Sequence, residues 1–459
     1  MNNKPIPRIH VLAKPTGAAC NLACSYCFFL DKELLYPGSK FRMSDEVLEN
    51  YIRQLIEAHS SPQVSVVWQG GEPTLMGLDF YRRAIEFQNK YRKPGMTFEN
   101  SMQTNGTLLN DEWCQFFKEN NFLIGISIDG PRELHDTYRV TKSGEGSFDM
   151  VMRGLRLLQK HGVEFNVLTT VNRINADYPL EVYRFLRDEA GASWIQFIPA
   201  IERITEDGLT IYQQGSTVSE RTVRPEQFGR FLIKVFDEWV MNDVGKMYMQ
   251  TFEATLGNWM RLPSAGICVF APTCGTALAL EHNGDLYSCD HYVEPDYLLG
   301  NILQEPMIEL AFSDQQVKFG NDKLDTLPKY CLECDVRFAC HGGCPKNRFI
   351  ETPAGEPGLN YLCAGWKAFF HRVDEPMKIL ATLLRMNRPA SDVMDILAER
   401  KDKLAEAYTN ATPNQTCPCG SGLEFRACHG WKLPSRGRKR RKKPVPRARP
   451  PVKGVADSE

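Results

Sequence analysis

Three cysteines near the start of the chain, Cys20, Cys24 and Cys27, constrain its chemistry most strongly. They form a C-x3-C-x2-C run just after a short apolar segment, His10–Ala13. Three thiolates on one tight loop can hold three irons of a cubane iron–sulfur cluster and leave the fourth iron without a protein ligand. Structural zinc is the alternative, but it needs four ligands, and no fourth Cys or His lies within the loop. The run therefore favours a cluster with one open iron, where chemistry can occur.

Residues 10–200 alternate short β-rich runs with helical stretches, which is typical of βα units around a parallel sheet. The expected strands are His10–Lys14, Val64–Trp68, Thr97–Gln103, Phe122–Ile128, Phe165–Val171 and Trp194–Ile198. Ser44–His59 carries apolar residues at helical spacing and predicts a helix between the first two strands. Six units predict an α/β fold with a partial (β/α)6 TIM barrel. A closed eight-unit barrel is the alternative, but we expect no further strands of this kind after Ile198.

Catalytic groups in parallel α/β barrels lie on the loops that follow the strands. The cysteine run follows the first strand, and Gln69-Gly70-Gly71-Glu72-Pro73 follows the second. The two glycines allow the backbone to approach a ligand closely. Ser127 and Ile201 lie at the ends of the fourth and sixth strands, and Arg139 lies in the loop after the fourth. Ordinary strand-end polarity is the alternative for each of these three taken singly.

In this order, the motifs resemble the signature of the radical S-adenosylmethionine (SAM) enzymes. The resemblance implies that the methionine part of SAM chelates the open iron of a [4Fe-4S] cluster held by Cys20, Cys24 and Cys27. One electron then cleaves SAM to a 5'-deoxyadenosyl radical. The contacts with SAM implied by the resemblance come from Tyr26, Gly70, Gly71, Glu72, Ser127, Arg139 and Ile201, with Tyr26 acting mainly through its backbone. Gln69, next to this loop, is a candidate for orienting the substrate.

Eight further cysteines lie between residues 268 and 363 and divide into two sets of four. One or two structural zinc ribbons are an alternative on spacing alone. The arrangement resembles the SPASM extension of radical SAM enzymes that modify peptides and proteins, which implies two auxiliary [4Fe-4S] clusters that carry electrons. By this resemblance the nearer cluster is held by Cys268, Cys274, Cys289 and Cys344, and the farther one by Cys331, Cys334, Cys340 and Cys363.

Asp290 directly follows Cys289, and capping a turn is its alternative role. The stretch Ser288-Cys289-Asp290-His291 resembles the anaerobic sulfatase-maturating enzymes, as do Cys-Asn-Leu-x-Cys-x-Tyr-Cys, Trp-Gln-Gly-Gly-Glu-Pro-Thr, Gln-Thr-Asn-Gly-Thr-Leu-Leu and Ser-Ile-Asp-Gly, all present here in order. The resemblance runs from about residue 8 to 385, and Phe29 departs from it where many relatives have a tyrosine.

This resemblance implies oxidation of a cysteine or serine of a sulfatase to Cα-formylglycine. The radical removes a hydrogen atom from the β-carbon, Asp290 accepts the proton of the thiol or hydroxyl, and an auxiliary cluster accepts the remaining electron. The implied partners are the unfolded or nascent sulfatase polypeptide and an electron donor such as flavodoxin or ferredoxin.

Two other functions are open. One is a maturase that forms crosslinks in ribosomal peptides; a leader-binding winged helix usually precedes its barrel, and nine residues before the first strand leave no space for one. The other is a non-catalytic metal-binding adaptor for nascent chains, which predicts zinc at the second cysteine region and no cleavage of SAM.

A last ligand set lies near the end of the chain, where Cys417, Cys419, Cys428 and His429 form C-x-C-x8-C-H. Three thiolates and an imidazole suit structural zinc, which can fold a short module without a core. The spacing resembles the SEC-C module. After it, Lys432–Lys453 carries eleven Lys or Arg and no acid, which predicts a disordered run. On one interpretation this run is only solvated charge, and on the other it contacts the ribosome, RNA or the secretion machinery.

The composition, with 42% hydrophobic and 24% charged residues, is that of a soluble globular protein. We expect cytoplasmic localisation without membrane insertion, because no apolar run approaches the ~20 residues of a membrane span and no signal peptide is recognisable. Fifteen cysteines then indicate metal ligands, and Cys114, left outside these sets, is expected in the core. The expected domains are a barrel (1–225), a SPASM domain (226–385), a helical linker (386–410), a zinc module (411–432) and a basic tail (433–459).

Overall fold

The computed structural model describes residues 9–59, 61–205, 215–263, 266–275, 277–419 and 421–429. The chain divides into two compact units, Met1–Asp395 and Ile396–Glu459. The basic run after residue 432 lies outside the described residues, so the prediction of disorder there stays a prediction.

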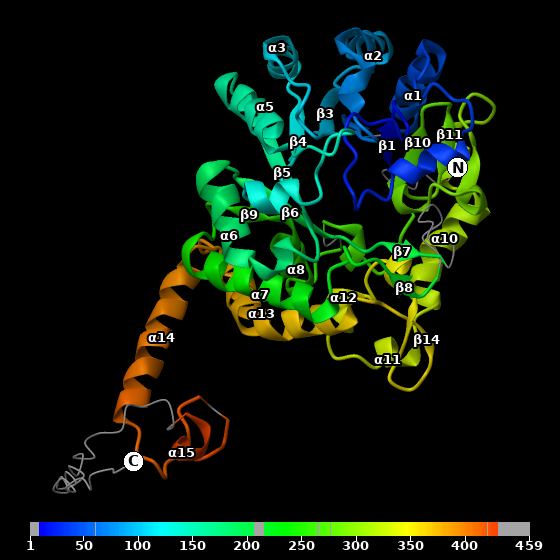
Figure 1. The fold of residues 1–459 in the computed structure, drawn as a ribbon. Coiled ribbons are helices and arrows are strands. Elements are labelled where there is room, and N and C mark those ends of the chain that lie inside the picture. The colour runs from blue at the N-terminus through cyan, green and yellow to red at the C-terminus, as the bar shows by residue number, and fades with distance from the viewer. Residues whose placement is uncertain are drawn as a thin grey trace, which may run out of the picture. The chain divides into compact units, whose positions relative to one another are not determined.

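The first unit is built on a ten-stranded sheet in the order β12-β11-β10-β1-β2-β3-β4-β5-β6-β9. Its central strands are parallel neighbours and follow the chain: β1 (His10–Lys14), β2 (Gln63–Trp68), β3 (Thr97–Thr104), β4 (Leu123–Ser127), β5 (Phe165–Val171) and β6 (Trp194–Pro199). Figure 1 shows helices along the outer side of these strands, among them α1 (Asp45–Ala58), α2 (Leu78–Tyr91), α3 (Asp111–Glu119) and α5 (Phe148–Lys160). This arrangement confirms the predicted α/β class and the partial barrel.

Local sequence explains why these helices form where they do, and α1 is an example. The Ser44 hydroxyl accepts a hydrogen bond from the amide of Val47 at 3.2 Å and caps the first turn. The apolar residues of α1 face the sheet, and the ring of Tyr51 packs edge-on against Trp68 of β2 at 5.7 Å between centroids. Burial of each such side chain contributes roughly 1.5–3 kcal/mol. Cys114 of α3 is fully buried, as predicted.

The expectation that no further strand of this kind follows Ile198 is wrong. β9 (Tyr248–Met249) pairs in parallel with β6, and β10 (Ala277–Glu281) pairs in parallel with β1 along its full length. β11 (Asp285–Tyr287) and β12 (Leu298–Asn301) extend the sheet in antiparallel orientation. Runs as short as β9 and β10 carry too few residues for periodicity to identify them. Because β10 to β12 lie within residues 226–385, one sheet crosses the expected boundary at 225, and that domain division stays a prediction.

The second half packs on the barrel through two long helices, α7 (Pro225–Asn242) and α13 (Cys363–Arg385). Their backbones touch at two glycines: a Cβ on Gly365 would lie 2.1 Å from the Pro225 carbonyl oxygen, and one on Gly229 would lie 2.7 Å from the Gly365 Cα. Aromatic rings fill the space between these helices and α8 (Gln250–Trp259), with Phe252 stacked on Phe369 at 5.8 Å. This contact fixes α13, which begins at Cys363, against the barrel.

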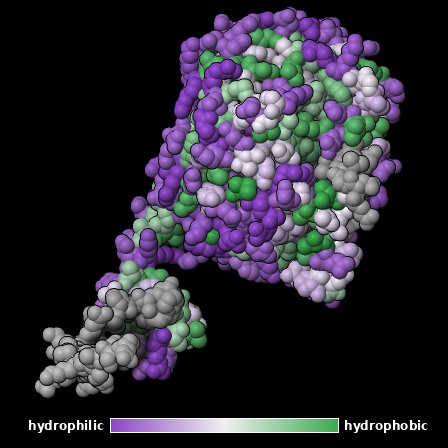
Figure 2. Space-filling model, in the orientation of Figure 1, coloured by the Kyte–Doolittle hydropathy of each residue, from purple (hydrophilic) through white to green (hydrophobic). Residues whose placement is uncertain are grey.

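The remaining helices and strands are short, apart from α10 and α14. They are α4 (Arg132–Asp136), α6 (Pro179–Arg184), β7 (Arg203–Ile204), β8 (Thr217–Val218), α9 (Met307–Ala311), α10 (Asp314–Asp325), α11 (Lys329–Leu332), α12 (Arg337–Cys340), β13 (Ile350–Glu351), β14 (Pro357–Leu359), α14 (Asp392–Asn410) and α15 (Phe425–Cys428). None of the described helices is both long and apolar enough to cross a membrane. Figure 2 shows a largely hydrophilic face with separate hydrophobic patches.

Candidate active site and metal centres

The loop that carries the first three cysteines begins where β1 ends. Burial, together with a smaller effect of the neighbouring thiols of the loop, raises the pKa of Cys20 to about 11 and that of Cys24 to about 12. The amide of Leu22 donates a hydrogen bond to the Cys20 Sγ at 3.4 Å. Buried thiolates need compensating positive charge. Three of them on one loop, without a fourth Cys or His in it, fit a cluster whose fourth iron is left for another ligand.

The Gly-Gly-Glu loop after β2 is bonded directly to the cysteine loop. The amide of Gly71 donates to the Gly17 carbonyl at 2.7 Å, and the amide of Glu72 donates to the Ala19 carbonyl at 2.9 Å. A Cβ on Gly71 would lie only 2.0 Å from the Ala19 carbonyl oxygen. Position 71 therefore has room only for glycine, because any side chain would separate the two loops.

The carboxylate of Glu72 is fully buried and ties this loop to the end of β3. It accepts hydrogen bonds from the Thr74 and Thr104 hydroxyls at 2.6 and 2.7 Å, and from the amides of Thr74 and Asn105 at 3.0 and 2.7 Å. Both oxygens are thus occupied within the protein. Gly70, Gly71 and Glu72, the three expected SAM-binding positions of this loop, therefore offer backbone groups to a ligand, because none of them has a free polar side chain.

Other expected SAM-binding residues meet around Asp129, just beyond β4. The Asp129 Oδ2 lies 3.2 Å from the Arg139 Nε and accepts a hydrogen bond from the Tyr26 hydroxyl at 2.5 Å. Ser127 accepts a hydrogen bond from the Gln103 amide at 2.9 Å. The structure therefore links the cysteine loop, through Tyr26, to the residues after β4, and Asp129 is the residue that holds them together. Ile201 is buried just beyond the end of β6.

Asp290 lies immediately after Cys289 and forms an ion pair with Lys14, the last residue of β1. Burial raises the pKa of Asp290, but the positive charges of Lys14 and of neighbouring side chains outweigh burial and hold it below its usual value. Asp290 is therefore ionised at neutral pH. Burial lowers the pKa of His291 to about 4, so this imidazole is neutral, and its Nδ1 lies 3.5 Å from the Cys344 Sγ.

Lys14 was not among the site residues predicted from the sequence. Its side chain is 2% exposed, and its ammonium lies 3.8 Å from the centroid of the Phe29 ring. A cation–π contact of this kind needs no hydroxyl, so the phenylalanine at position 29 serves it as well as a tyrosine would. A lysine that ends an apolar strand is the one signal that marked this residue in the sequence.

The eight cysteines of the second region fall into two neighbourhoods. Burial raises the pKa of Cys289 well above its usual value, and the thiols of Cys344 and Cys268 add to the effect; Cys274 has the same two thiol neighbours. Burial likewise raises the pKa of Cys340 to about 12, with contributions from the other three members of the second set. The structure thus brings together the two interleaved sets expected from the sequence: Cys268, Cys274, Cys289 and Cys344, and Cys331, Cys334, Cys340 and Cys363.

The distances between their ligand atoms distinguish these two sets from a site for a single ion. Within the described part of the chain, only the C-terminal set brings three or more Cys, His or acidic ligand atoms within 4.8 Å of one another. Four thiols that are spread more widely than a mononuclear zinc site requires fit an iron–sulfur cube better than one tetrahedral ion. This observation weakens the zinc-ribbon alternative for the second region.

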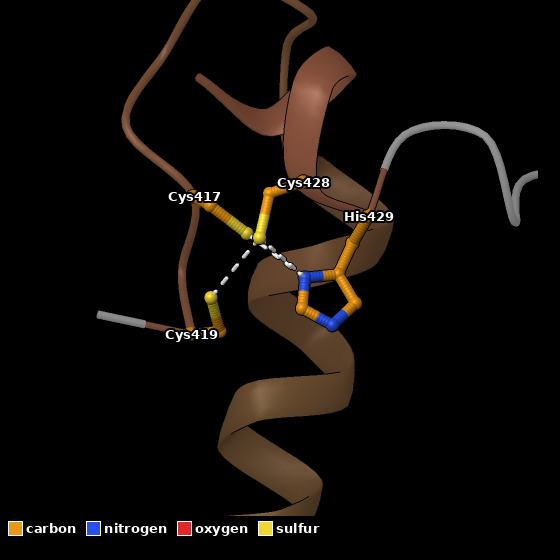
Figure 3. Close-up of side chains that lie close together, drawn as sticks. All are labelled: Cys417, Cys419, Cys428 and His429. Carbon is orange, nitrogen blue, oxygen red and sulfur yellow. Dashed lines mark hydrogen bonds between the residues drawn. The ribbon is translucent and has the colours of Figure 1, made fainter. Parts of the chain in front are cut away.

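The C-terminal set has the compact geometry of a mononuclear site (Figure 3). The Nδ1 of His429 lies 3.3 Å from the Cys417 Sγ and 3.2 Å from the Cys428 Sγ, and the Cys419 and Cys428 sulfurs are 3.5 Å apart. Hydrogen bonds from Ser421 lower the pKa of Cys419 to about 6, which favours the thiolate that a metal binds. Three thiolates and one imidazole fit zinc.

Comparisons with known proteins agree with this layout. Family models match residues 15–186 (radical SAM superfamily), 268–335 (SPASM, iron–sulfur cluster-binding domain) and 414–430 (SEC-C motif). The serine-type anaerobic sulfatase-maturating enzyme of Bacteroides thetaiotaomicron is 48% identical over 403 residues, which cover 86% of this chain and 97% of that protein. The cysteine-type enzyme of Clostridium perfringens is 32% identical over 369 residues, covering 80% and 96% of the two chains.

Solved structures give the same result. A structure described as native anSMEcpe with bound AdoMet matches with a TM-score of 0.73 at 30% identity, over 81% of this chain and 99% of that one. A second, with bound AdoMet and the Cp18Cys peptide, matches with a TM-score of 0.73 at 31% identity, over 82% and 100%.

Proposed function

The chain belongs to the anaerobic sulfatase-maturating enzymes of the radical SAM superfamily, and we propose which of its residues carry out the reaction and which substrate it takes. As a member of this family it is an oxidoreductase that converts a serine or cysteine of a sulfatase to Cα-formylglycine. The observation that supports the proposal most directly is the convergence, at the end of β1, of the cysteine loop, the Gly-Gly-Glu loop and Asp290.

Three [4Fe-4S] clusters and SAM are the proposed cofactors. Cys20, Cys24 and Cys27 would hold the cluster that binds SAM, and the two sets of four would hold the auxiliary clusters. When bound, the first cluster and SAM supply a 5'-deoxyadenosyl radical that removes a hydrogen atom from the substrate's β-carbon. Iron analysis of anaerobically purified protein tests the proposal: we expect about twelve irons per chain, and about four would contradict the auxiliary clusters.

The protein's part in binding SAM is to present fixed polar groups. We expect Gly70, Gly71 and Glu72 to bind the amino group through their backbone, because the Glu72 carboxylate already holds the end of β3. Ser127 and Arg139 would contact SAM from the end of β4. The backbone of Tyr26 and the side chain of Ile201 would lie along the adenine, and Gln69 would orient the substrate.

Asp290 is the proposed proton acceptor. It is an ionised carboxylate whose side chain retains 16% exposure at the end of β1, next to the cysteine loop. We expect Asp290→Asn to cleave SAM normally but to form little formylglycine, because the amide accepts no proton from the hydroxyl or thiol. Quantifying 5'-deoxyadenosine and aldehyde in the same reaction tests this role, and undiminished aldehyde would remove Asp290 from the mechanism.

We further propose that serine is the preferred target. The chain is 48% identical to a serine-type relative and 32% identical to cysteine-type relatives over comparable lengths. Mass spectrometry of a serine peptide and its cysteine twin, each incubated anaerobically with enzyme, SAM and dithionite, tests the preference. We expect the serine peptide to lose two hydrogens, and conversion of the cysteine peptide alone would contradict the proposal.

The polypeptide substrate is proposed to enter in an extended form, as unfolded or nascent sulfatase, because a folded protein could not present one buried side chain to SAM. An electron donor such as flavodoxin or ferredoxin would supply the electron. Reduced thiols as cluster ligands fit a cytoplasmic protein. The C-terminal set would bind zinc, and the basic run after it would contact the ribosome or the secretion machinery.

A further inference from the structure

Lys14 is one of the most deeply buried charged residues of the chain. It ends β1, its residue exposure is 1%, and its ammonium pairs with the Asp290 carboxylate. Asp290 lies 276 positions further along the chain, at the start of the turn that follows Cys289. The ion pair therefore joins the first strand of the barrel to the segment of the nearer auxiliary set.

The position of the Lys14 ammonium is fixed on several sides. The Phe29 ring lies 3.8 Å from it, and Lys14 is held in register with Glu281 of β10 by the parallel pairing of the two strands. Behind it, a Cβ on Gly70 would lie 3.3 Å from the Lys14 Cβ, so the Gly-Gly-Glu loop packs on the stem of this side chain. A lysine confined in this way sets where its partner carboxylate lies.

The other cations near Asp290 have partners of their own. The Lys346 ammonium lies 4.1 Å from the centroid of the Phe28 ring, and the Lys32 ammonium lies 3.4 Å from a carboxylate oxygen of Glu294. His291, the next residue, places its Nδ1 against Cys344. Lys14, by contrast, forms its ion pair with Asp290 itself.

From this geometry we propose that Lys14 is a positioning residue, which holds the Asp290 carboxylate at the place where it meets the hydroxyl or thiol of the substrate. The inference rests on the proposed role of Asp290 and adds the residue through which that role is set. Lys14 itself does not touch the substrate. Its effect is on the step that follows hydrogen abstraction.

The balance of that step shows why position matters. One hydrogen atom leaves the β-carbon to the 5'-deoxyadenosyl radical, the hydroxyl or thiol proton passes to a carboxylate oxygen of Asp290, and one electron leaves to an auxiliary iron–sulfur cluster, so that a C=O or C=S bond forms. Proton transfer requires the carboxylate oxygen within about 2.6–3.2 Å of the donor. Without Lys14 the carboxylate is free to turn away, and radicals formed at the β-carbon do not become product.

The test measures formylglycine formed per 5'-deoxyadenosine in the holoenzyme with a short serine peptide. Lys14→Met should lower this ratio about tenfold, since small displacements of a reacting group have effects of this order or larger, while SAM cleavage continues. Lys14→Arg should restore part of the ratio, because it keeps the charge. Crystals of the Lys14→Met holoenzyme should show the Asp290 side chain displaced.

Lys32→Met is the matched control, because Lys32 is equally buried and is paired with a different carboxylate, that of Glu294. It should keep the wild-type ratio. A wild-type ratio in Lys14→Met, or an equal fall in both variants, would overturn the inference. If Lys14→Met loses iron, Phe29→Leu provides the test, because it removes the ring that contacts the Lys14 ammonium. A lower ratio of formylglycine to 5'-deoxyadenosine in this variant supports the inference, and an unchanged ratio overturns it. A wild-type ratio in Asp290→Asn would instead overturn the role of Asp290 itself.

Discussion

At the scale of single residues, the first unit depends on cations that are buried and paired. Lys14 and Lys32 face carboxylates, and Lys323, 1% exposed, donates hydrogen bonds to the carbonyl oxygens of Cys268 and Val269 at 2.6 and 3.1 Å. Lysine is almost never fully buried unless it is paired. The thiolates of the proposed ligand sets give a reason for so many buried cations, since each cluster with its thiolates adds negative charge to the interior.

A second buried residue, His135, predicts how stability depends on pH. Its side chain is fully buried, its Nδ1 accepts a hydrogen bond from the Asp129 amide at 3.3 Å, and its Nε2 lies 3.0 Å from the Ser147 hydroxyl. Burial, with a smaller effect from Arg139, lowers its pKa well below the ordinary value of 6.5. The folded protein therefore holds this imidazole neutral at pH values where the unfolded chain binds a proton.

The stability contributed by neutral His135 is thus complete above pH 6.5 and is lost as the pH falls below it, by up to about 1.4 kcal/mol per pH unit. We expect the melting temperature of the anaerobic holoprotein to fall between pH 6.5 and 5.5. In His135→Gln the fall should be shallower, even if the variant is less stable at every pH. Equal slopes in thermal unfolding of the two proteins would contradict the prediction.

At the scale of elements, the loops that follow β1, β2 and β3 are hydrogen-bonded to one another. The side-chain amide of Asn21, in the cysteine loop, donates a hydrogen bond to the Thr107 hydroxyl at 2.8 Å. Its oxygen accepts a hydrogen bond from the side-chain amide of Asn105 at 2.9 Å. Together with the bonds from Gly71 and Glu72, these contacts make one rigid rim from three loops. Such a rim spares SAM the cost of ordering loops when it binds.

Gly71→Ala tests this coupling, because the added Cβ would meet the backbone of Ala19 at 2.0 Å and the two loops must separate. We expect a loss of stability of roughly 1–3 kcal/mol and a weaker change in the cluster's electron paramagnetic resonance signal when SAM is added. Gly144→Ala is the control: Gly144 has a positive φ of +86° but no atom within 4 Å of the new Cβ. An unaltered SAM response in Gly71→Ala would show that the loops need not touch.

The same elements show which parts of the fold could be predicted from the sequence. Strands β1 to β6 were predictable because each is followed by an amphipathic helix or a motif, and β1 and β5 match their expected bounds. β10 was missed because five residues, Ala277–Glu281, carry no distinguishing period, although it becomes the neighbour of β1. Lys14 was missed as a site residue because its partner, Asp290, meets it only in the folded chain. The pairing of Asp129 with Arg139 is likewise visible only there.

At the scale of the whole molecule, the two auxiliary sets bind distant parts of the second half together. Cys344 follows three members of the farther set in the chain, yet its thiol neighbours Cys268 and Cys289 belong to the nearer set. Cys363 starts α13 and closes the farther set. No rule of spacing assigns such an interleaved division, so it was predictable only through the family resemblance.

The division of the chain into two units leads to a prediction about the C-terminal module, because the proposed zinc ligands and the proposed catalytic groups lie in different units. All residues proposed for SAM, clusters and proton transfer belong to Met1–Asp395, whereas Cys417, Cys419, Cys428 and His429 belong to Ile396–Glu459. α14 buries only Val393, near its start. Truncation after Asn410 should therefore leave the iron content, the melting temperature and the turnover of a short serine peptide unchanged, while zinc falls by one equivalent.

The same truncation should slow the maturation of a full-length nascent sulfatase if the C-terminal module recruits the substrate. A full-length double variant, Cys419→Ser and Cys428→Ser, distinguishes the zinc module from the basic run, because it removes two zinc ligands but keeps the basic run. Loss of nascent-chain activity in the truncation alone assigns recruitment to the basic run, and equal loss in both assigns it to the zinc-folded module. A parallel fall in short-peptide turnover and iron content would contradict the separation, because it would mean that the second unit supports the active site itself.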